Sequence, residues 1–194
     1  MSKHKYSPRI PRYAAGIRLH DPRLAFSRNW WGRRWLESLE EMRLQGRFGR
    51  GKLYALSGQV LSLESAGSTV TARVLGMRSD PYTVTLRFRN PGDGFRARIV
   101  AALRAEPALV ARLADDDLPF EVADLFRREE TGLFPGGRLA PGSYDVTTDC
   151  TCPDYANPCK HSVAALMILG EEVARRPATL LELRGIRLEE LYES

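Results

Sequence analysis

Long hydrophobic runs are missing from this chain of 194 residues, and so are the usual sequence patterns of nucleotide-binding and hydrolytic enzymes. The longest apolar run, residues 163–169, is too short to cross a bilayer, which takes about 20 residues. No apolar leader of the secretory type opens the sequence, so we expect a cytoplasmic protein that can also associate with the nucleoid. Without a phosphate loop, a dinucleotide fingerprint, a Ser/His/Asp set or paired carboxylates, we expect no enzyme, no small-molecule substrate and no membrane partner.

Cysteine is scarce as well, and its distribution is informative. The chain has three cysteines, Cys150, Cys152 and Cys159, and His161 follows directly after them. The spacing is Cys-x-Cys, six residues, then Cys-x-His. Three thiolates and one imidazole complete a four-coordinate shell of the type that zinc prefers. The motif therefore predicts one zinc ion, Zn2+, held by these four residues.

Other uses of these residues fit less well. A disulfide is disfavoured by the odd number of cysteines and by the short Cys-x-Cys spacing. A nucleophilic pair of Cys159 and His161 would leave Cys150 and Cys152 without a role. A catalytic zinc ion keeps an open position for water, whereas four ligands fill the shell, and the zinc deaminase signature is absent. We therefore predict a structural zinc ion.

The residues around the motif predict how the four ligands are brought together. Residues 144–148 alternate and are rich in β-formers, so a strand leads into Cys150. Pro153 and the Asn157-Pro158 pair turn the chain back. From Cys159 a helix runs to Arg175, which places Cys159 and His161 in its first turn. Residues 163–169 are apolar on every side of that helix, so it should be buried.

This motif, between a strand and a helix, resembles the SWIM zinc finger, named for SWI/SNF ATPases and MuDR transposases. Cys150, Cys152, Cys159 and His161 match its four ligand positions. The segments at residues 30–36, 54–60 and 184–191 are similar to those of small bacterial SWIM proteins. Such proteins are often paired with SWI/SNF-like helicase ATPases. The resemblance implies DNA as a ligand and an ATPase of this kind as a partner.

The rest of the chain predicts an α+β fold: a small antiparallel β meander with packed helices and a C-terminal β-hairpin/helix zinc knuckle. The predicted strands are residues 59–64, 69–75 and 82–88, and the predicted helices are residues 30–45, 95–113 (restarted at Pro107), 120–128, 160–175, 177–185 and 188–192. Ser27 or Asn29 can cap the first helix, and Asp115–Asp117 is expected to cap the helix that begins at Phe120. Trp30 in the first helix is either a core residue or an exposed contact. Residues 47–52 are predicted to be a flexible linker because they contain only glycine, phenylalanine and basic residues.

We divide the chain into a basic, poorly ordered arm (1–25), an α+β region (26–142) and the SWIM-type finger with C-terminal helices (143–194). Positive charge is concentrated early: residues 1–52 carry 13 of the 29 Lys and Arg residues but 4 of the 24 Asp and Glu residues. A cationic surface attracts phosphate by releasing counterions. The candidate contacts for nucleic acid are Arg33, Arg34, Arg47, Arg50, Lys52 and Lys160.

Two functional hypotheses follow. The first is a non-catalytic zinc-binding SWIM finger protein that binds nucleic acid, with DNA as the expected form, and acts as an accessory to a SWI/SNF-like ATPase. The alternative is a purely protein-binding adaptor with a structural zinc site. Salt-dependent binding to nucleic acid separates the two hypotheses.

Overall fold

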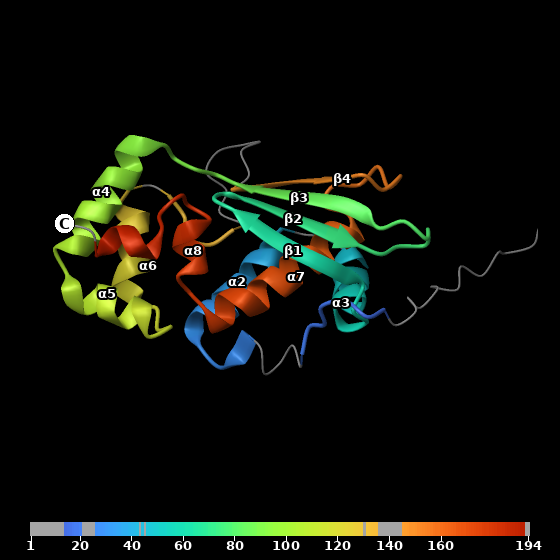
Figure 1. Cartoon of the computed structure of the whole chain (residues 1–194), viewed down its shortest axis with the longest axis horizontal. Coiled ribbons are helices and arrows are strands. Elements are labelled where there is room, and N and C mark those ends of the chain that lie inside the picture. Colours follow the sequence, from blue (N-terminus) through green and yellow to red (C-terminus); the bar gives the residue numbers. More distant parts are fainter. Residues whose placement is uncertain are drawn as a thin grey trace, which may run out of the picture.

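The computed structural model describes residues 14–20, 26–42, 44, 46–129, 131–135 and 145–192. In these residues, helices pack against one antiparallel sheet, which confirms the predicted α+β fold (Figure 1). The elements in chain order are α2 (Trp30–Glu41), α3 (Gly46–Leu56), β1 (Val60–Ala66), β2 (Thr69–Val74), β3 (Tyr82–Phe88), α4 (Asp93–Arg104), α5 (Pro107–Ala114), α6 (Phe120–Arg128), β4 (Val146–Cys150), α7 (Lys160–Arg175), α8 (Thr179–Glu182) and the 3-10 turn η1 (Leu188–Leu191). None of the described helices is long and apolar enough to cross a membrane.

The sheet has the strand order β1-β2-β3-β4, with every pair antiparallel. Strands β1 to β3 form the predicted meander. Strand β4, which leads into the zinc motif, pairs with β3 from Phe88↔Val146 to Val84↔Cys150. Buried and exposed residues alternate along the strands: Val70 and Ala72 are buried, whereas Thr71 is exposed. The sheet therefore has one apolar face. Its last strand, β4, ends at Cys150, the first residue of the zinc motif.

Helix α7 lies at the centre of the core. Of its 16 residues, 13 are buried, and it packs against α2, α3 and all four strands. This confirms the prediction that an apolar surface on every side of the helix requires burial. Trp35 of α2 lies against α7 and donates a hydrogen bond from its indole Nε1 to the carbonyl oxygen of Leu166 at 3.1 Å. The same helix thus carries zinc ligands at its start and core residues along its length.

Residues 47–52 belong to helix α3, so the predicted linker is wrong. A Cβ atom at Gly51 would lie 2.4 Å from the side chain of Val163, which means that only glycine lets α3 approach α7 this closely. The contact with α7 stabilises a helix whose three glycines would disfavour it in isolation. The basic residues of this segment are therefore held on a helix that packs against the zinc-binding helix.

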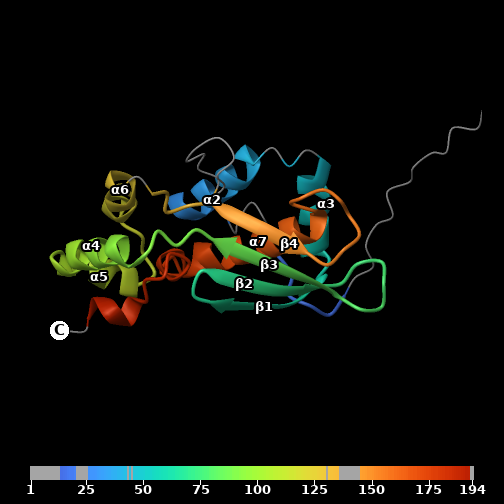
Figure 2. The ribbon, with the colours of Figure 1, turned by 90° about the horizontal axis from the view of Figure 1, so that it is seen from above.

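Helices α4, α5 and α6 lie at one end of the molecule, and α3 lies at the other (Figures 1 and 2). The predicted cap of α6 by Asp115–Asp117 is wrong, because the helix begins after Pro119 without a side-chain cap and Asp117 binds Arg112 at 2.7 Å. Trp30 joins this end to α2: its Nε1 donates to the carbonyl oxygen of Leu118 at 2.9 Å, and its ring stacks on Phe120. Trp30 therefore makes contacts within the chain.

One predicted helix cap is confirmed, whereas the two predicted domain boundaries fall on or beside residues outside the described ranges. Asn29 caps α2, as its side chain accepts a hydrogen bond from the backbone of Gly32 at 2.8 Å. The boundary between residues 142 and 143 lies outside the described residues. Of the predicted arm 1–25, the described part is residues 14–20, where the backbone of Ile17 donates to the carbonyl oxygen of Val60 at 2.7 Å. This short segment thus runs along the start of β1.

Candidate metal centre

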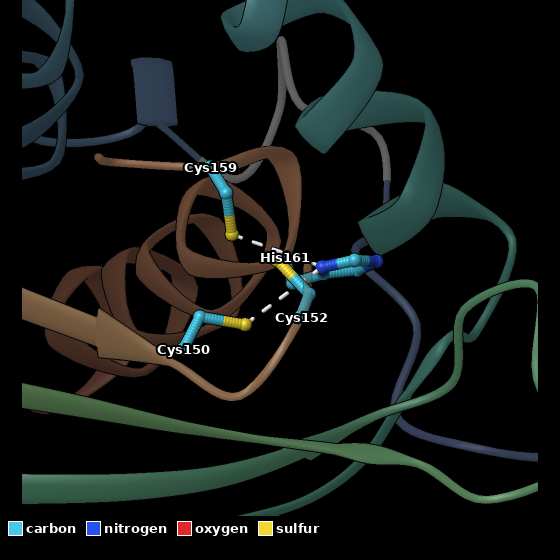
Figure 3. A group of neighbouring side chains, drawn as sticks. All are labelled: Cys150, Cys152, Cys159 and His161. Atoms are coloured by element: carbon cyan, nitrogen blue, oxygen red, sulfur yellow. Dashed lines mark hydrogen bonds between the residues drawn. The ribbon is translucent and has the colours of Figure 1, made fainter. Parts of the chain in front are cut away.

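Three thiols and one imidazole meet where β4 ends and α7 begins. The ligand atoms of Cys150, Cys152, Cys159 and His161 all lie within 4.8 Å of one another. Figure 3 shows the four side chains converging from the end of the strand, the loop that follows it and the first turn of the helix. The structure thus brings together all four residues that the motif predicts as zinc ligands.

Local hydrogen bonds hold the two halves of the site in place. Beyond Cys150, the chain still pairs with β3, because the backbone of Thr151 donates to the carbonyl oxygen of Thr83 at 3.0 Å. The loop then folds back onto β4: the amide of Asn157 donates to the carbonyl oxygen of Thr148 at 2.6 Å, and the hydroxyl of Thr148 donates to the side-chain oxygen of Asn157. Cys159 is the N-cap residue of α7. Strand, loop and helix are therefore fixed relative to one another at the ligand positions.

The spacing of the ligand atoms fits a zinc ion. Nδ1 of His161 lies 3.8 Å from Sγ of Cys150 and 3.7 Å from Sγ of Cys159. A tetrahedral zinc ion with Zn–S near 2.3 Å and Zn–N near 2.0 Å separates its ligand atoms by about 3.5–3.8 Å. Four protein ligands leave no position for a reacting water molecule. The cluster is suited to a single structural zinc ion, with His161 turned to use Nδ1.

The protonation of the cysteines is uneven. Hydrogen bonding with Cys150 lowers the pKa of Cys159 to about 3, and His161 and Ser162 act in the same direction. The same hydrogen bond, together with burial, raises the pKa of Cys150, and burial raises the pKa of Cys152. Zinc binding requires all three thiols to lose their protons, and the contacts of Cys159 favour its thiolate. Acid should weaken zinc binding for the same reason.

Two tyrosines enclose the imidazole of His161. Tyr54 of α3 meets the ring edge-on at 5.4 Å between centroids, and Tyr82 of β3 lies at 4.8 Å. The loop after β2 closes over the same ring, since a Cβ atom at Gly76 would lie 3.1 Å from Nε2 of His161. No local sequence pattern predicts these neighbours, because they come from elements about 80 and 110 residues away in the chain. Together they bury the ligand and fix its orientation.

Four of the six candidate contacts for nucleic acid lie near the zinc site. Arg47, Arg50 and Lys52 are on α3, and Lys160 is in the first turn of α7. The ammonium group of Lys160 lies 5.3 Å from the ring centroid of Tyr54, so it reaches across to α3. Among the described residues, none of these four side chains forms an ion pair with a carboxylate.

Arg33 and Arg34 lie elsewhere, near the start of α2. That part of α2 packs against the C-terminal end of α7, where the indole Nε1 of Trp31 donates to the carbonyl oxygen of Ala174 at 3.2 Å. At 1.5 Å per residue, this is about 20 Å along α7 from Lys160. Arg34 is also bound by Glu41 at 2.8 Å and by Glu37 at 3.5 Å, and the bond with Glu41 raises its pKa. The structure thus separates these two arginines from the other four candidates.

Comparison with known proteins agrees with the site. The SWIM zinc finger family model matches residues 143–170, which confirms the SWIM zinc finger predicted in this segment. Over 185 residues, the chain is 34% identical to a protein of Mycobacterium tuberculosis described as "Uncharacterized protein Rv2102". The alignment covers 95% of this chain and 65% of that relative, so the chain spans less than two thirds of the relative's length. No solved structure matches the chain.

Proposed function

We propose that this protein, which carries a SWIM zinc finger with one structural zinc site, is not an enzyme and binds nucleic acid, namely DNA, through α3 and the first turn of α7. It would serve as an accessory to a SWI/SNF-like ATPase, a partner that the family resemblance suggests. In this proposal the zinc ion shapes the surface, and the side chains around it contact phosphate.

The observation that carries the proposal is the charge of α3. This helix has three cations, Arg47, Arg50 and Lys52, and no acidic residue. Several arginines elsewhere on the molecule are paired with carboxylates, for example Arg98 with Glu129 at 2.7 Å. Cations without acidic partners keep their full attraction for phosphate, because no carboxylate has to be displaced when they bind it.

The zinc site itself supports a shaping role for the metal. A zinc ion with three thiolates and one imidazole has a net charge of −1, so it does not attract phosphate. Lys160 offsets that charge beside the site, and α3 adds a net charge of +3. The attraction for phosphate thus comes from the two helices that the finger holds next to each other.

The test is a titration of labelled duplex and single-stranded DNA at several salt concentrations. Replacing Arg47, Arg50 and Lys52 together by glutamine should weaken binding and reduce the slope of log K against log salt by about 2–3. A matched control replaces Arg98, Arg112 and Arg127 by glutamine, which removes three charges that are paired with carboxylates at the other end of the molecule. The proposal is wrong if both triple variants bind DNA equally well, or if the unmodified protein has no measurable affinity for DNA at low salt. Either result would support the adaptor hypothesis instead. Co-purification of a SWI/SNF-like ATPase tests the partner separately.

A further inference from the structure

The two most exposed large apolar side chains in the described part of the chain both flank the metal centre. Tyr155 is 97% exposed in the loop between Cys152 and Cys159, and Met77 is 68% exposed in the loop between β2 and β3. We call the surface formed by α3, residues 76–81 and residues 151–160 the zinc end. In Figure 1 it lies opposite to helices α4, α5 and α6. Exposed aromatic and apolar groups gathered at one place indicate a contact surface.

The loop that carries Tyr155 is held at both of its ends. Cys152 and Cys159 belong to the metal site, and Asn157 is tied to Thr148 of β4 by two hydrogen bonds. Within the loop, a carboxylate oxygen of Asp154 accepts a hydrogen bond from the backbone of Ala156 at 3.1 Å. A loop fixed in this way holds Tyr155 out into solvent without the entropic cost of ordering it on binding.

The loop that carries Met77 packs on one of the zinc ligands. Its Gly76 packs on the rings of Tyr82 and His161, and the guanidinium of Arg78 lies 5.9 Å from the Tyr82 ring centroid. Arg78 and Asp80 balance each other in charge on this loop. Asp154 and Lys160 balance each other in the same way within residues 151–160. The net positive charge of the zinc end therefore comes from α3, and the two loops add mainly apolar and aromatic surface.

We infer that the zinc end binds single-stranded nucleic acid, with an unpaired base stacked on Tyr155 and beside Met77 and with the phosphates held by α3 and Lys160. This inference rests on the proposed function and specifies its ligand. Single strands are bound by a cationic surface combined with aromatic side chains, because the π-face of an unpaired base is free to stack. In a duplex those faces are already covered by neighbouring bases, so Tyr155 would add little to the affinity for a duplex.

The test measures binding of a labelled oligothymidine, of an abasic oligonucleotide with the same number of phosphates, and of a matched duplex. Replacing Tyr155 by alanine should weaken binding of the oligothymidine about tenfold and leave binding of the abasic strand unchanged. Tyr155→Phe should restore most of the affinity, because it keeps the aromatic face. Tyr192→Ala removes another exposed tyrosine, 56% exposed and next to the η1 turn, and serves as the matched control.

The outcomes separate the inference from the proposed function. If Tyr155→Ala reduces binding of the oligothymidine and the abasic strand equally or not at all, base stacking is ruled out, while an effect of the α3 triple variant would still support binding of phosphate. If the duplex binds more tightly than the single strand, the inference is also overturned. Zinc content and the melting temperature of the two Tyr155 variants should match those of the unmodified protein, since the Tyr155 side chain is almost fully exposed.

Discussion

Strand β4 is anchored at its two ends by different chemistry, and the comparison explains how the finger joins the rest of the fold. At its C-terminal end, Cys150 enters the metal centre. Just before its N-terminal end, the carboxylate of Asp145 accepts a hydrogen bond from Arg184, with both side chains 1% exposed. Arg184 also donates to the carbonyl oxygen of Arg89 at 3.0 Å and to that of Leu133 at 3.3 Å. The metal holds β4 and the loop after it to α7, whereas the ion pair holds the C-terminal segment to the sheet.

The two anchors should fail under different conditions. A metal site is lost with a chelator or in acid, because protons compete with zinc for the ligands. A buried ion pair is insensitive to chelators, but breaking it leaves one charge without a partner in a place that water cannot reach. Damage at one anchor should therefore be distinguishable from damage at the other.

The largest effect is expected from removing the metal. Replacing Cys152 by alanine should abolish stoichiometric zinc binding, and a loss of even about 5 kcal/mol would lower the melting temperature by about 10–20 °C for a chain of this size. A chelator added to the unmodified protein should have the same effect. Zinc analysis and thermal unfolding followed by far-UV CD check both. Tyr155→Ala, in the same loop, is the control and should keep both zinc and stability. An unchanged melting curve after complete zinc removal would contradict a structural role.

Breaking the buried ion pair should come next. Arg184→Met should lower the free energy of unfolding by about 3–5 kcal/mol and leave one zinc ion bound. Denaturant unfolding and metal analysis measure the two quantities. The double variant Asp145→Leu/Arg184→Met is the control, since it removes both charges and should recover part of the lost stability. Loss of zinc together with stability in Arg184→Met would show that the two anchors are not independent.

The ion pair also predicts the pH dependence of the variant. Burial raises the pKa of Asp145, and Arg184 opposes that rise. Without Arg184 the folded-state pKa of Asp145 rises further above its unfolded value, so the protonated carboxyl favours folding at low pH and this stability is lost as the pH rises. The deficit of Arg184→Met should therefore be smaller at about pH 5 than at about pH 8. A deficit that is independent of pH would mean that Asp145 keeps its charge when its partner is gone.

The smallest of these effects concerns the packing of α3 on α7. Gly51→Ala should destabilise the protein by about 1–3 kcal/mol, because its Cβ would meet Val163. Gly49→Ala on the same helix is the matched control. Apart from its chain neighbours and the backbone of its own helix, no atom of the described residues lies within 4 Å of the position of its Cβ, so the alanine should stabilise the helix by about 0.5–1 kcal/mol. The free energy of unfolding of each variant decides the matter, and destabilisation of the same size in both would exclude the packing explanation.

Local signals in the sequence were sufficient for the elements that carry the site. The alternating residues before Cys150 and the apolar run after His161 predict strand β4 and helix α7, and the Cys-x-Cys and Cys-x-His pairs predict the SWIM zinc finger. The N-cap at Asn29 and the start of a new helix at Pro107 can also be predicted from the sequence, because each depends on a few neighbouring residues.

Contacts between segments that are distant in the chain cannot be predicted from local sequence patterns. The glycine and basic residues at 47–52 predict a linker, and only the close approach of α3 to Val163 shows why Gly51 is a glycine. The pairing of Asp145 with Arg184 spans 39 residues, and Tyr54 and Tyr82 reach His161 from other elements. Such contacts follow from the packing of the whole chain, and no short sequence pattern records them.

The most direct test of the account is zinc K-edge X-ray absorption on protein purified without added metal. We predict one zinc ion per chain, with three sulfur ligands at about 2.3 Å and one nitrogen ligand at about 2.0 Å. A spectrum with fewer than three sulfur ligands, an oxygen ligand from water in the shell, or a zinc content well below one per chain would contradict a closed structural site formed by Cys150, Cys152, Cys159 and His161.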